Sequence, residues 1–250
     1  MKSEKNLSFL SVFILPVLAL FFAATAWSAE IDCLTCHGDL VKKKVKHPAV
    51  DMGCPSCHSA VDAADIPHKM TNKVAKGLSA EQPDLCYGCH DKAQFTKKTV
   101  HPALSMGCTT CHNPHASDNP RMLTSPVPDL CFTCHDKAEF SRKNVHPPVA
   151  AGKCLTCHSP HSSDSIALLR KEPAAVCLDC HAAVQKEPHA IRGFSSAGHP
   201  LSSNNKQDPK RPGRPFYCGS CHNPHSSDSM RLFRYPAKSK MSLCVNCHTY

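Results

Sequence analysis

Nine copies of the pentapeptide Cys-x-x-Cys-His account for all 18 cysteines of this 250-residue chain, so no cysteine is left for a structural disulfide. Two thiols at this spacing can reach the two vinyl groups on one edge of a porphyrin, and the adjacent histidine can then ligate the iron. The pattern therefore predicts nine covalently attached haem c groups as the cofactors. The cysteines that would form the thioethers are Cys33, Cys36, Cys54, Cys57, Cys86, Cys89, Cys108, Cys111, Cys131, Cys134, Cys154, Cys157, Cys177, Cys180, Cys218, Cys221, Cys244 and Cys247. The iron ligands within the motifs would be His37, His58, His90, His112, His135, His158, His181, His222 and His248.

Zinc binding is the main alternative, because Cys-x-x-Cys pairs also hold structural zinc ions. A zinc site does not require a histidine directly after every second cysteine, and here all nine pairs have one. Thioredoxin-like redox chemistry uses one or two such pairs within a βαβ pattern, which this sequence lacks. Haem attachment is therefore favoured over both alternatives.

The N-terminus has the pattern of an export signal. Lys2 and Lys5 form a short basic region, and the apolar run Leu7–Ala26 ends in small residues that allow cleavage there or at Ala29. The alternative is an uncleaved membrane anchor, because about 20 apolar residues can span a bilayer. Pro16 interrupts the run, which favours cleavage. Residues 1–29 are thus predicted to be a signal peptide, followed by a mature chain with no stable membrane span.

The mature chain is built from internal repeats with two motifs in each unit. The segment Asp84–Ala93 returns 45 residues later as Asp129–Ala138, and a second recurring segment follows each copy. The fourth unit contains an insertion between His181 and Cys218. The nonahaem domain is expected to span residues 30–250, with doubled units at about 31–69, 82–127, 128–173 and 174–239 and the ninth motif alone in 240–250.

Close motif spacing and 21 prolines leave little room for regular secondary structure. No segment shows the period-two alternation of a strand. Short helices are expected at Ser165–Lys171, Pro173–Gln185 and Ser229–Arg234, the last capped by Ser227 or Asp228. The predicted fold class is a multihaem cytochrome c: mostly irregular with short α-helices, no significant sheet, and an extended haem chain forming the core.

Nine further histidines lie outside the motifs and match in number the nine irons that lack a second axial ligand. Those followed by proline are His47, His101, His146 and His199; those placed after a second motif are His68, His115, His161 and His225; His189 is the spare, assigned to the lone ninth haem. All nine are therefore candidate distal ligands.

Geometry restricts which haem each distal histidine can serve. Residues three apart project to the same side of a local turn, whereas the two axial ligands of an iron approach from opposite faces. His115 therefore cannot complete the haem held by His112 and must reach a neighbouring one. The sequence leaves the individual pairs open.

Two imidazoles on every iron would leave no open position for a substrate, so electron transfer is the expected function. None of the seven methionines follows a ligand-like period, and bis-histidine ligation without methionine predicts low potentials. The net charge of +9 is attributed to neutralising the two propionates of each haem, so no nucleic-acid partner is expected.

The repeated Cys-His-Asn-Pro-His of residues 111–115 and 221–225 resembles the doubled-CxxCH family of multihaem cytochromes. The resemblance covers about residues 31–250 and implies a largely irregular chain wrapped around a row of haems. It implies an exported protein of anaerobic respiration, either a periplasmic carrier or a protein associated with the outer membrane, or an extracellular one. The nine haems and the atypical first unit depart from the decahaem pattern of the porin-inserted members.

The resemblance also implies the classes of redox partner. A membrane quinol-oxidising cytochrome would be the electron donor, and a terminal reductase or an outer-membrane porin or cytochrome would be the acceptor. The alternative function is a multihaem reductase with one open haem site, and storage of haem or metal is a third. No Cys-x-x-Cys-Lys motif and no sizeable non-repeating portion occurs here, which favours an electron carrier over an enzyme.

Overall fold

The computed structural model describes residues 31–185, 189 and 206–249. The chain from Cys33 onward forms one compact unit, separate from the segment up to Asp32. The predicted signal peptide, residues 1–29, lies outside the described residues. Within the described part, no helix has the length and apolar character that a membrane span requires.

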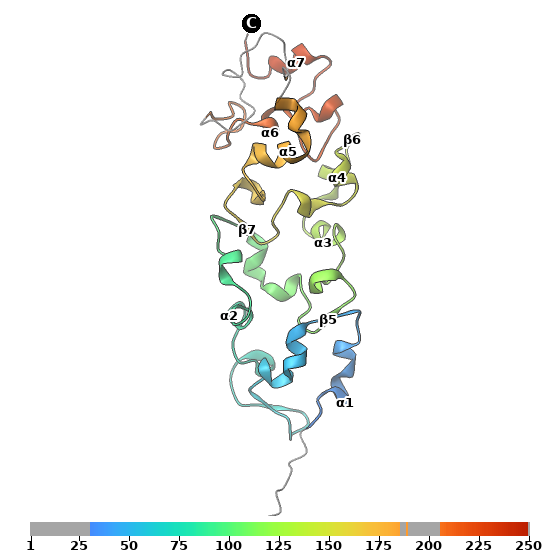
Figure 1. Ribbon diagram of the computed structural model, residues 1–250, viewed down its shortest axis with the longest axis vertical. Helices are drawn as coiled ribbons and strands as arrows, with labels where there is room; N and C mark the ends of the chain where they lie inside the picture. The colour runs from blue at the N-terminus through green and yellow to red at the C-terminus, as the bar shows by residue number, and fades with distance from the viewer. Residues whose placement is uncertain (1–30, 186–188, 190–205, 250) are drawn as a thin grey trace, which may run out of the picture. The chain divides into compact units, whose positions relative to one another are not determined.

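The described residues contain seven short α-helices, joined by long irregular segments (Figure 1). They are α1 Leu34–His37, α2 Asp84–Tyr87, α3 Asp129–Phe132, α4 Pro147–Ala150, α5 Pro173–His181, α6 Cys218–Cys221 and α7 Lys240–Cys244. The longest described helix, α5, begins where its sequence predicts. Pro173 occupies the first turn, and the carboxylate of Glu172 accepts hydrogen bonds from the backbone N–H groups of Ala174 and Ala175. With the 3-10 turn η12 (Ala182–Gln185), it covers the predicted range 173–185.

Thirteen 3-10 turns fill much of the remaining described chain. They are η1 Gly38–Val41, η2 Pro48–Met52, η3 Cys54–Ser56, η4 Ala75–Gly77, η5 Lys92–Gln94, η6 Pro102–Met106, η7 Cys108–Thr110, η8 Pro120–Met122, η9 Lys137–Phe140, η10 Cys154–Thr156, η11 Ile166–Leu168, η12 Ala182–Gln185 and η13 Met230–Leu232. Many of these turns recur at equivalent places in successive units, which gives the repeated sequence a repeated backbone.

The His-Pro segments begin one recurring turn. In the first two units the proline occupies the first position of η2 or η6, where its fixed φ favours a helical turn. Gly53 and Gly107 then adopt φ of 91° and 88°, a region that favours glycine, and redirect the chain into the next motif. This local geometry sets the distance between a His-Pro histidine and the motif that follows it.

Two predicted helices are wrong. Ser165–Lys171 and Ser229–Arg234 contain only the three-residue turns η11 and η13, and Ala167 and Arg231 inside them have φ of 51° and 54°. The buried Ser227 caps no helix and instead donates its hydroxyl to the carbonyl of Phe233. The chain reverses at these turns, and the residues that follow them, Leu169 and Phe233, form antiparallel bridges with the motif histidines His158 and His222.

In the part of the chain that the structure describes, the strands form four antiparallel ladders of two residues per strand, beside a few isolated bridges. Val61–Asp62 (β2) pairs with Lys69–Met70 (β3) inside the first unit. The other three ladders join successive units: Val45–Lys46 (β1) with Ala116–Ser117 (β5), Thr99–Val100 (β4) with Ser162–Ser163 (β7), and Asn144–Val145 (β6) with Ser226–Ser227 (β8). The predicted fold class, mostly irregular with short helices and no significant sheet, is confirmed.

The described residues bury very little apolar side-chain material. Their buried hydrophobic residues are Ala60, Ala116, Met122, Ala174 and Phe233, of which three are alanines. Large apolar side chains such as Met52 and Met106, which precede the glycines before two motifs, are 68% and 55% exposed. A polypeptide core of this size is too small for a domain of this length, which fits a chain whose interior is supplied by porphyrins.

Candidate haem-binding sites

Each motif is folded into one turn that gathers its two cysteines and its histidine. In eight motifs the backbone N–H of the histidine donates to the carbonyl of the first cysteine, four residues earlier, at 2.9–3.1 Å. The remaining motif histidine, His181, ends helix α5. Positions i, i+3 and i+4 of a helical turn lie on one face, so all three side chains can meet one porphyrin. No disulfide joins any of the 18 cysteines, all of which lie among the described residues and are at least partly exposed.

Within a unit, the first cysteines of the two motifs contact each other. Burial, followed by the charge and hydrogen bond of Cys108, raises the pKa of the Cys86 thiol to about 11. Burial and Cys154 raise the pKa of Cys131 to about 11 in the same way. The third such pair is Cys177 with Cys218, where the side-chain hydrogen bond is the main cause that raises the pKa of Cys177 and lowers that of Cys218.

Between units, one cysteine also lies close enough to a cysteine of the adjacent motif to add to the effect of burial in raising that cysteine's pKa. The pKa of Cys86 is raised by Cys57, that of Cys111 by Cys134, that of Cys157 by Cys180, and that of Cys221 by Cys247. Together with the contacts inside the units, these pairs link the second to the ninth motif without a break. The attachment sites therefore follow one another in space in the order in which they occur in the sequence.

Eight motif histidines each face one histidine from outside the motifs. The ring-centre distances are 6.0 Å for His37–His68, 6.1 Å for His58–His115, 6.1 Å for His90–His47, 5.9 Å for His112–His161, 6.2 Å for His135–His101, 5.8 Å for His158–His225, 6.1 Å for His181–His146 and 6.1 Å for His222–His189. Two imidazoles that bind one metal from opposite sides, each at about 2.0–2.1 Å, have ring centres roughly 6 Å apart. Each pair thus has the separation that one iron between the rings requires.

The pairs supply two ligands each and no more. Nowhere in the described ranges do three or more His, Cys, Asp or Glu side chains gather as a group that could hold a metal ion. A porphyrin provides four nitrogen ligands, so two axial imidazoles are what its iron still needs. The side chains present therefore fit haem.

A backbone carbonyl orients the second motif histidine of each unit. The Nδ1 atoms of His58, His112, His158 and His222 all donate to the carbonyl of a residue in the following turn, at 2.9 Å. The accepting residues are Lys76, Arg121, Ala167 and Arg231, and all four have left-handed φ between 51° and 62°. This hydrogen bond fixes the tautomer and leaves Nε2 free to bind iron.

These left-handed carbonyls cannot be recognised from the residue types at their positions. None of the four accepting residues is a glycine, so the usual sign of a left-handed backbone is absent. Only Gly77, next to Lys76, hints at such a turn in the first unit. In the second to fourth units the usable signal is an apolar pair that begins ten residues after the second motif histidine, namely Met122-Leu123, Leu168-Leu169 and Leu232-Phe233.

The distal histidines after Asn-Pro or Ser-Pro are held in their neutral form. Burial, and then the neighbouring His58 or His112, lowers the pKa of His115 and His161 below the ordinary value. For His225, burial and the nearby His158 lower the pKa to about 4. Neutral imidazole is the form that coordinates a metal, so these environments favour ligation.

Backbone hydrogen bonds tie together distal histidines that face different motifs. The N–H of His47 donates to the carbonyl of His115 at 2.8 Å, beside the β1–β5 ladder. The same bond joins His101 to His161 at 2.8 Å and His146 to His225 at 3.0 Å. Each junction between units therefore carries two histidine pairs on one short ladder.

His189 faces a different motif from the one that the sequence predicts. His189 faces His222 of the eighth motif and was expected to serve the lone ninth motif. The reason is local: the eighth motif has no histidine from a following unit, and His189 reaches it from its own unit. His199 lies outside the described residues, and the pairing of His248 is therefore not among the eight.

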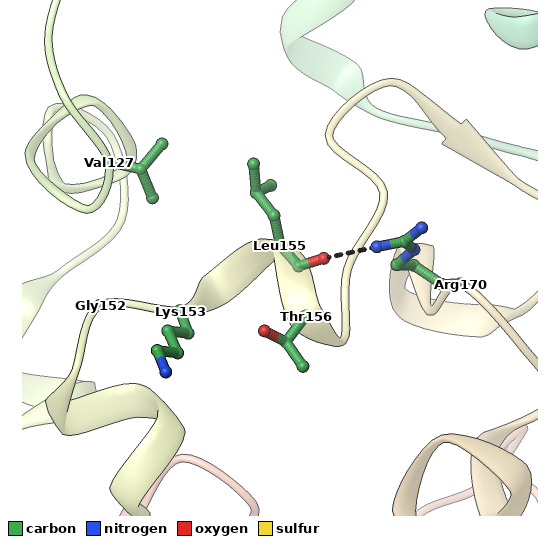
Figure 2. Close-up of a pocket in the computed structure, with 6 residues that line it drawn as sticks. All are labelled: Val127, Gly152, Lys153, Leu155, Thr156 and Arg170. Carbon is green, nitrogen blue, oxygen red and sulfur yellow. Dashed lines mark hydrogen bonds between the residues drawn. The ribbon is translucent and has the colours of Figure 1, made fainter. Parts of the chain in front are cut away.

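A pocket of about 450 Å³ lies beside the sixth motif (Figure 2). Leu155 and Thr156, the two middle residues of that motif, form one wall, and Val127 from the segment before the fifth motif faces them. The guanidinium of Arg170 donates to the carbonyl of Leu155 at 3.1 Å. The pocket thus lies where the fifth and sixth motifs adjoin, with a basic rim formed by Lys153 and Arg170.

Repeated Cys-x-x-Cys-His turns that supply covalent attachment for several haems define a multihaem c-type cytochrome. The chain belongs to the family described as "Doubled CXXCH motif", whose profile matches residues 47–95, 101–140, 146–186 and 211–250. The first motif precedes the matched residues.

One curated relative is similar to part of the chain. It is the "Multiheme cytochrome MtrA" of Shewanella baltica (strain OS185), which is 33% identical over 103 residues. The match covers 38% of this chain and 28% of MtrA, so the aligned part is well under two thirds of the relative's length. This distant similarity places both proteins among the multihaem cytochromes.

Proposed function

We propose that this protein carries nine haem c groups, each bound by two histidines, and passes electrons along them. The observation that carries the proposal is the set of eight histidine pairs with ring centres 5.8–6.2 Å apart. Every pair joins one motif histidine to one histidine from outside the motifs. Such regular complementarity is hard to explain unless an iron lies between the rings.

The ninth pair follows from the order of the repeats. His47, His101 and His146 each face the first motif histidine of the next unit, namely His90, His135 and His181. His199 is the next His-Pro histidine in the sequence, and His248 is the next motif histidine in that series. We therefore assign His199 to the ninth haem.

Electron transfer is favoured because bis-histidine irons have no open coordination position. The cysteine contacts support fast transfer between neighbours, since a thioether joins the edge of its porphyrin and adjoining thioethers bring two edges together. Contacts of this kind link the second to the ninth motif. Ligation by imidazole alone predicts low reduction potentials.

We also propose an exported protein that works in the periplasm or at the outer membrane in anaerobic respiration. The export pattern of residues 1–29 and the similarity to MtrA support this location. Its partners would be redox proteins: a quinol-oxidising membrane cytochrome as donor, and a terminal reductase or an outer-membrane porin or cytochrome as acceptor.

Carbon monoxide binding to the reduced holoprotein tests the proposal. If every iron holds two imidazoles, the visible spectrum of the reduced protein stays unchanged under carbon monoxide. A carbon monoxide adduct amounting to about one haem in nine would instead indicate a reductase with an open site. Intact mass under denaturing conditions gives the haem count in the same sample.

A further inference from the structure

Two distal histidines have a phenylalanine ring against them. The pairs are Phe95 with His161, at 4.8 Å between ring centres, and Phe140 with His225, at 4.9 Å. Each phenylalanine also contacts the aromatic residue of the first motif in its own unit, Tyr87 or Phe132, at 5.6 Å. The same cluster of three rings therefore occurs twice, as Tyr87–Phe95–His161 and as Phe132–Phe140–His225.

A buried hydroxyl holds each phenylalanine in place. Ser162 and Ser226, which follow the two histidines, are 2% and 0% exposed. The hydroxyl of Ser162 donates to the carbonyl of Gln94 at 2.8 Å and accepts from the N–H of Lys97 at 3.2 Å, so it bridges the turn that carries Phe95. Ser226 makes the equivalent bonds around Phe140, at 2.7 Å and 3.3 Å.

The first junction lacks both parts of this arrangement. Val41 stands six residues before His47, as Phe95 stands six residues before His101, and Ala116 replaces the serine. Among the described residues, His115 has a ring contact with His58 and with no phenylalanine. The first junction is therefore a natural comparison within the same chain.

The angle between the two imidazole planes of a pair is larger at the two junctions that have the phenylalanine than at the first junction. The planes of His112 and His161 are 39° apart, and those of His158 and His225 are 40° apart. At the first junction, the planes of His58 and His115 are only 19° apart.

At the three junctions, a phenylalanine against the distal ring goes with a larger angle between the two imidazole planes. The remaining pairs do not all follow this rule. The pairs His47–His90 and His101–His135 are nearly parallel, at 9° and 6°, and His146–His181 is intermediate, at 26°; none of the three has a phenylalanine contact at the distal ring among the described residues. His189–His222, at 38°, has Phe233 at 5.3 Å from the motif histidine. His37–His68 reaches 47° with no phenylalanine contact among the described residues; there Nδ1 of His68 bonds the carbonyl of Asp65.

We propose that Phe95 and Phe140 are positioning residues that hold the imidazoles of His161 and His225 turned away from the planes of their partner histidines. This inference rests on the proposed function, since it needs both pairs to ligate haem iron. The angle between two axial imidazoles decides how their π electrons act on the iron d orbitals. As the planes turn from parallel, the largest g value of low-spin ferric haem increases. The fourth and sixth haems are thereby made electronically different from the second, third and fifth.

Electron paramagnetic resonance of the fully oxidised holoprotein tests this role, with Phe95→Val as the main variant because valine stands at the equivalent place in the first unit. The expected result is that about one ninth of the ferric intensity moves to a smaller largest g value, while all haems stay low-spin. Ser162→Ala should move the same component in the same direction by a smaller amount. The reciprocal double variant Val41→Phe with Ala116→Ser should move the second haem in the opposite direction.

A spectrum unchanged by Phe95→Val, with nine haems still attached, would overturn the proposal. A new high-spin signal would also overturn it, because Phe95 would then keep the ligand bound without turning it. If Phe95→Val protein does not accumulate with nine haems, Ser162→Ala and the reciprocal variant decide by the same two criteria. Failure of the proposed function is distinct, because the wild-type protein itself would then bind carbon monoxide or lack bis-histidine signals.

Discussion

The backbone N–H of His47 lies 2.8 Å from the backbone carbonyl of His115, although the two imidazoles face motif histidines in different units. His47 faces His90 of the second unit, and His115 faces His58 of the first. The second and third units pair their histidines in this way with the unit before and the unit after them. In neither of them does a motif histidine face a histidine of its own unit. The first and fourth units differ, because each holds one internal pair, His37–His68 and His189–His222.

Removal of one distal histidine should open a haem in the next unit. In His47→Ala, the iron held by His90 loses its second ligand, so the reduced protein should bind one carbon monoxide per molecule. Optical titration measures this stoichiometry.

The site of binding is found by deleting a haem in the same background. Cys86→Ala with Cys89→Ala removes the third haem and should abolish carbon monoxide binding. The matched control, Cys54→Ala with Cys57→Ala, removes the second haem and should leave the binding intact. The reverse pattern would show that His47 serves its own unit.

Glycine at a left-handed position should stabilise the protein. Ala167 has a φ of 51°, a conformation that costs an alanine about 1–2 kcal/mol. Glycine avoids that cost but loses more entropy on folding, so Ala167→Gly should raise the free energy of unfolding by about 0.5–1 kcal/mol. Chemical denaturation followed by haem absorbance measures the change.

Ala138→Gly is the matched control, because Ala138 lies inside the 3-10 turn η9 and has no left-handed φ. The same substitution there should lower the stability by about 0.5–1 kcal/mol. Equal effects of the two substitutions would mean that Ala167 is not strained.

The insertion in the fourth unit depends on a buried carboxylate. Burial by itself would raise the pKa of Asp208, but hydrogen bonds from Arg211, Ser220 and the N–H of Lys210 lower it below its usual value. The Asp208 side chain is only 2% exposed and lies 2.7 Å from Nε of Arg211. Asp208→Asn should therefore lower the free energy of unfolding at neutral pH by about 1–3 kcal/mol.

The pH dependence of this effect has a defined sign. Because the folded pKa of Asp208 is depressed, its contribution is complete above the unfolded value of about 3.9 and is lost as the pH falls through the folded pKa. The stability difference between wild type and Asp208→Asn should thus shrink in acid. A matched surface variant, Asp39→Asn, whose carboxylate is 94% exposed, should show little effect at any pH. A difference that grows in acid would contradict this role.

The sequence predicted which residues form the sites better than it predicted which motif each histidine outside the motifs faces. All nine motifs and the nine further histidines were evident, and the three-residue spacing of His112 and His115 correctly indicated that these two do not face one another. His189 was placed with the wrong motif because the insertion that follows it hides which segments lie close together. Spacing along the chain does not specify distance across a junction between units.

The missed elements of the fold share one physical cause. A strand of two residues, such as β5, has no periodicity to detect, and it forms only because β1 of another unit lies beside it. The turns at Ala167 and Arg231 contradict local helix propensity, and hydrogen bonds to His158 and His222 stabilise them. The local sequence pattern of these segments favours a helix, whereas contacts with residues distant in the sequence fix a reversing turn. The sequence pattern alone therefore predicts the wrong structure there.

Near-infrared magnetic circular dichroism of the oxidised holoprotein measures the axial ligation of the nine haems, because its charge-transfer band reports the axial ligands of each ferric haem. If all nine irons hold two histidines, the spectrum shows one low-spin band at the position of bis-histidine haem, with an intensity equal to all nine haems counted by intact mass. A high-spin band, or a bis-histidine intensity that falls short of the haem count, would contradict bis-histidine ligation of all nine irons.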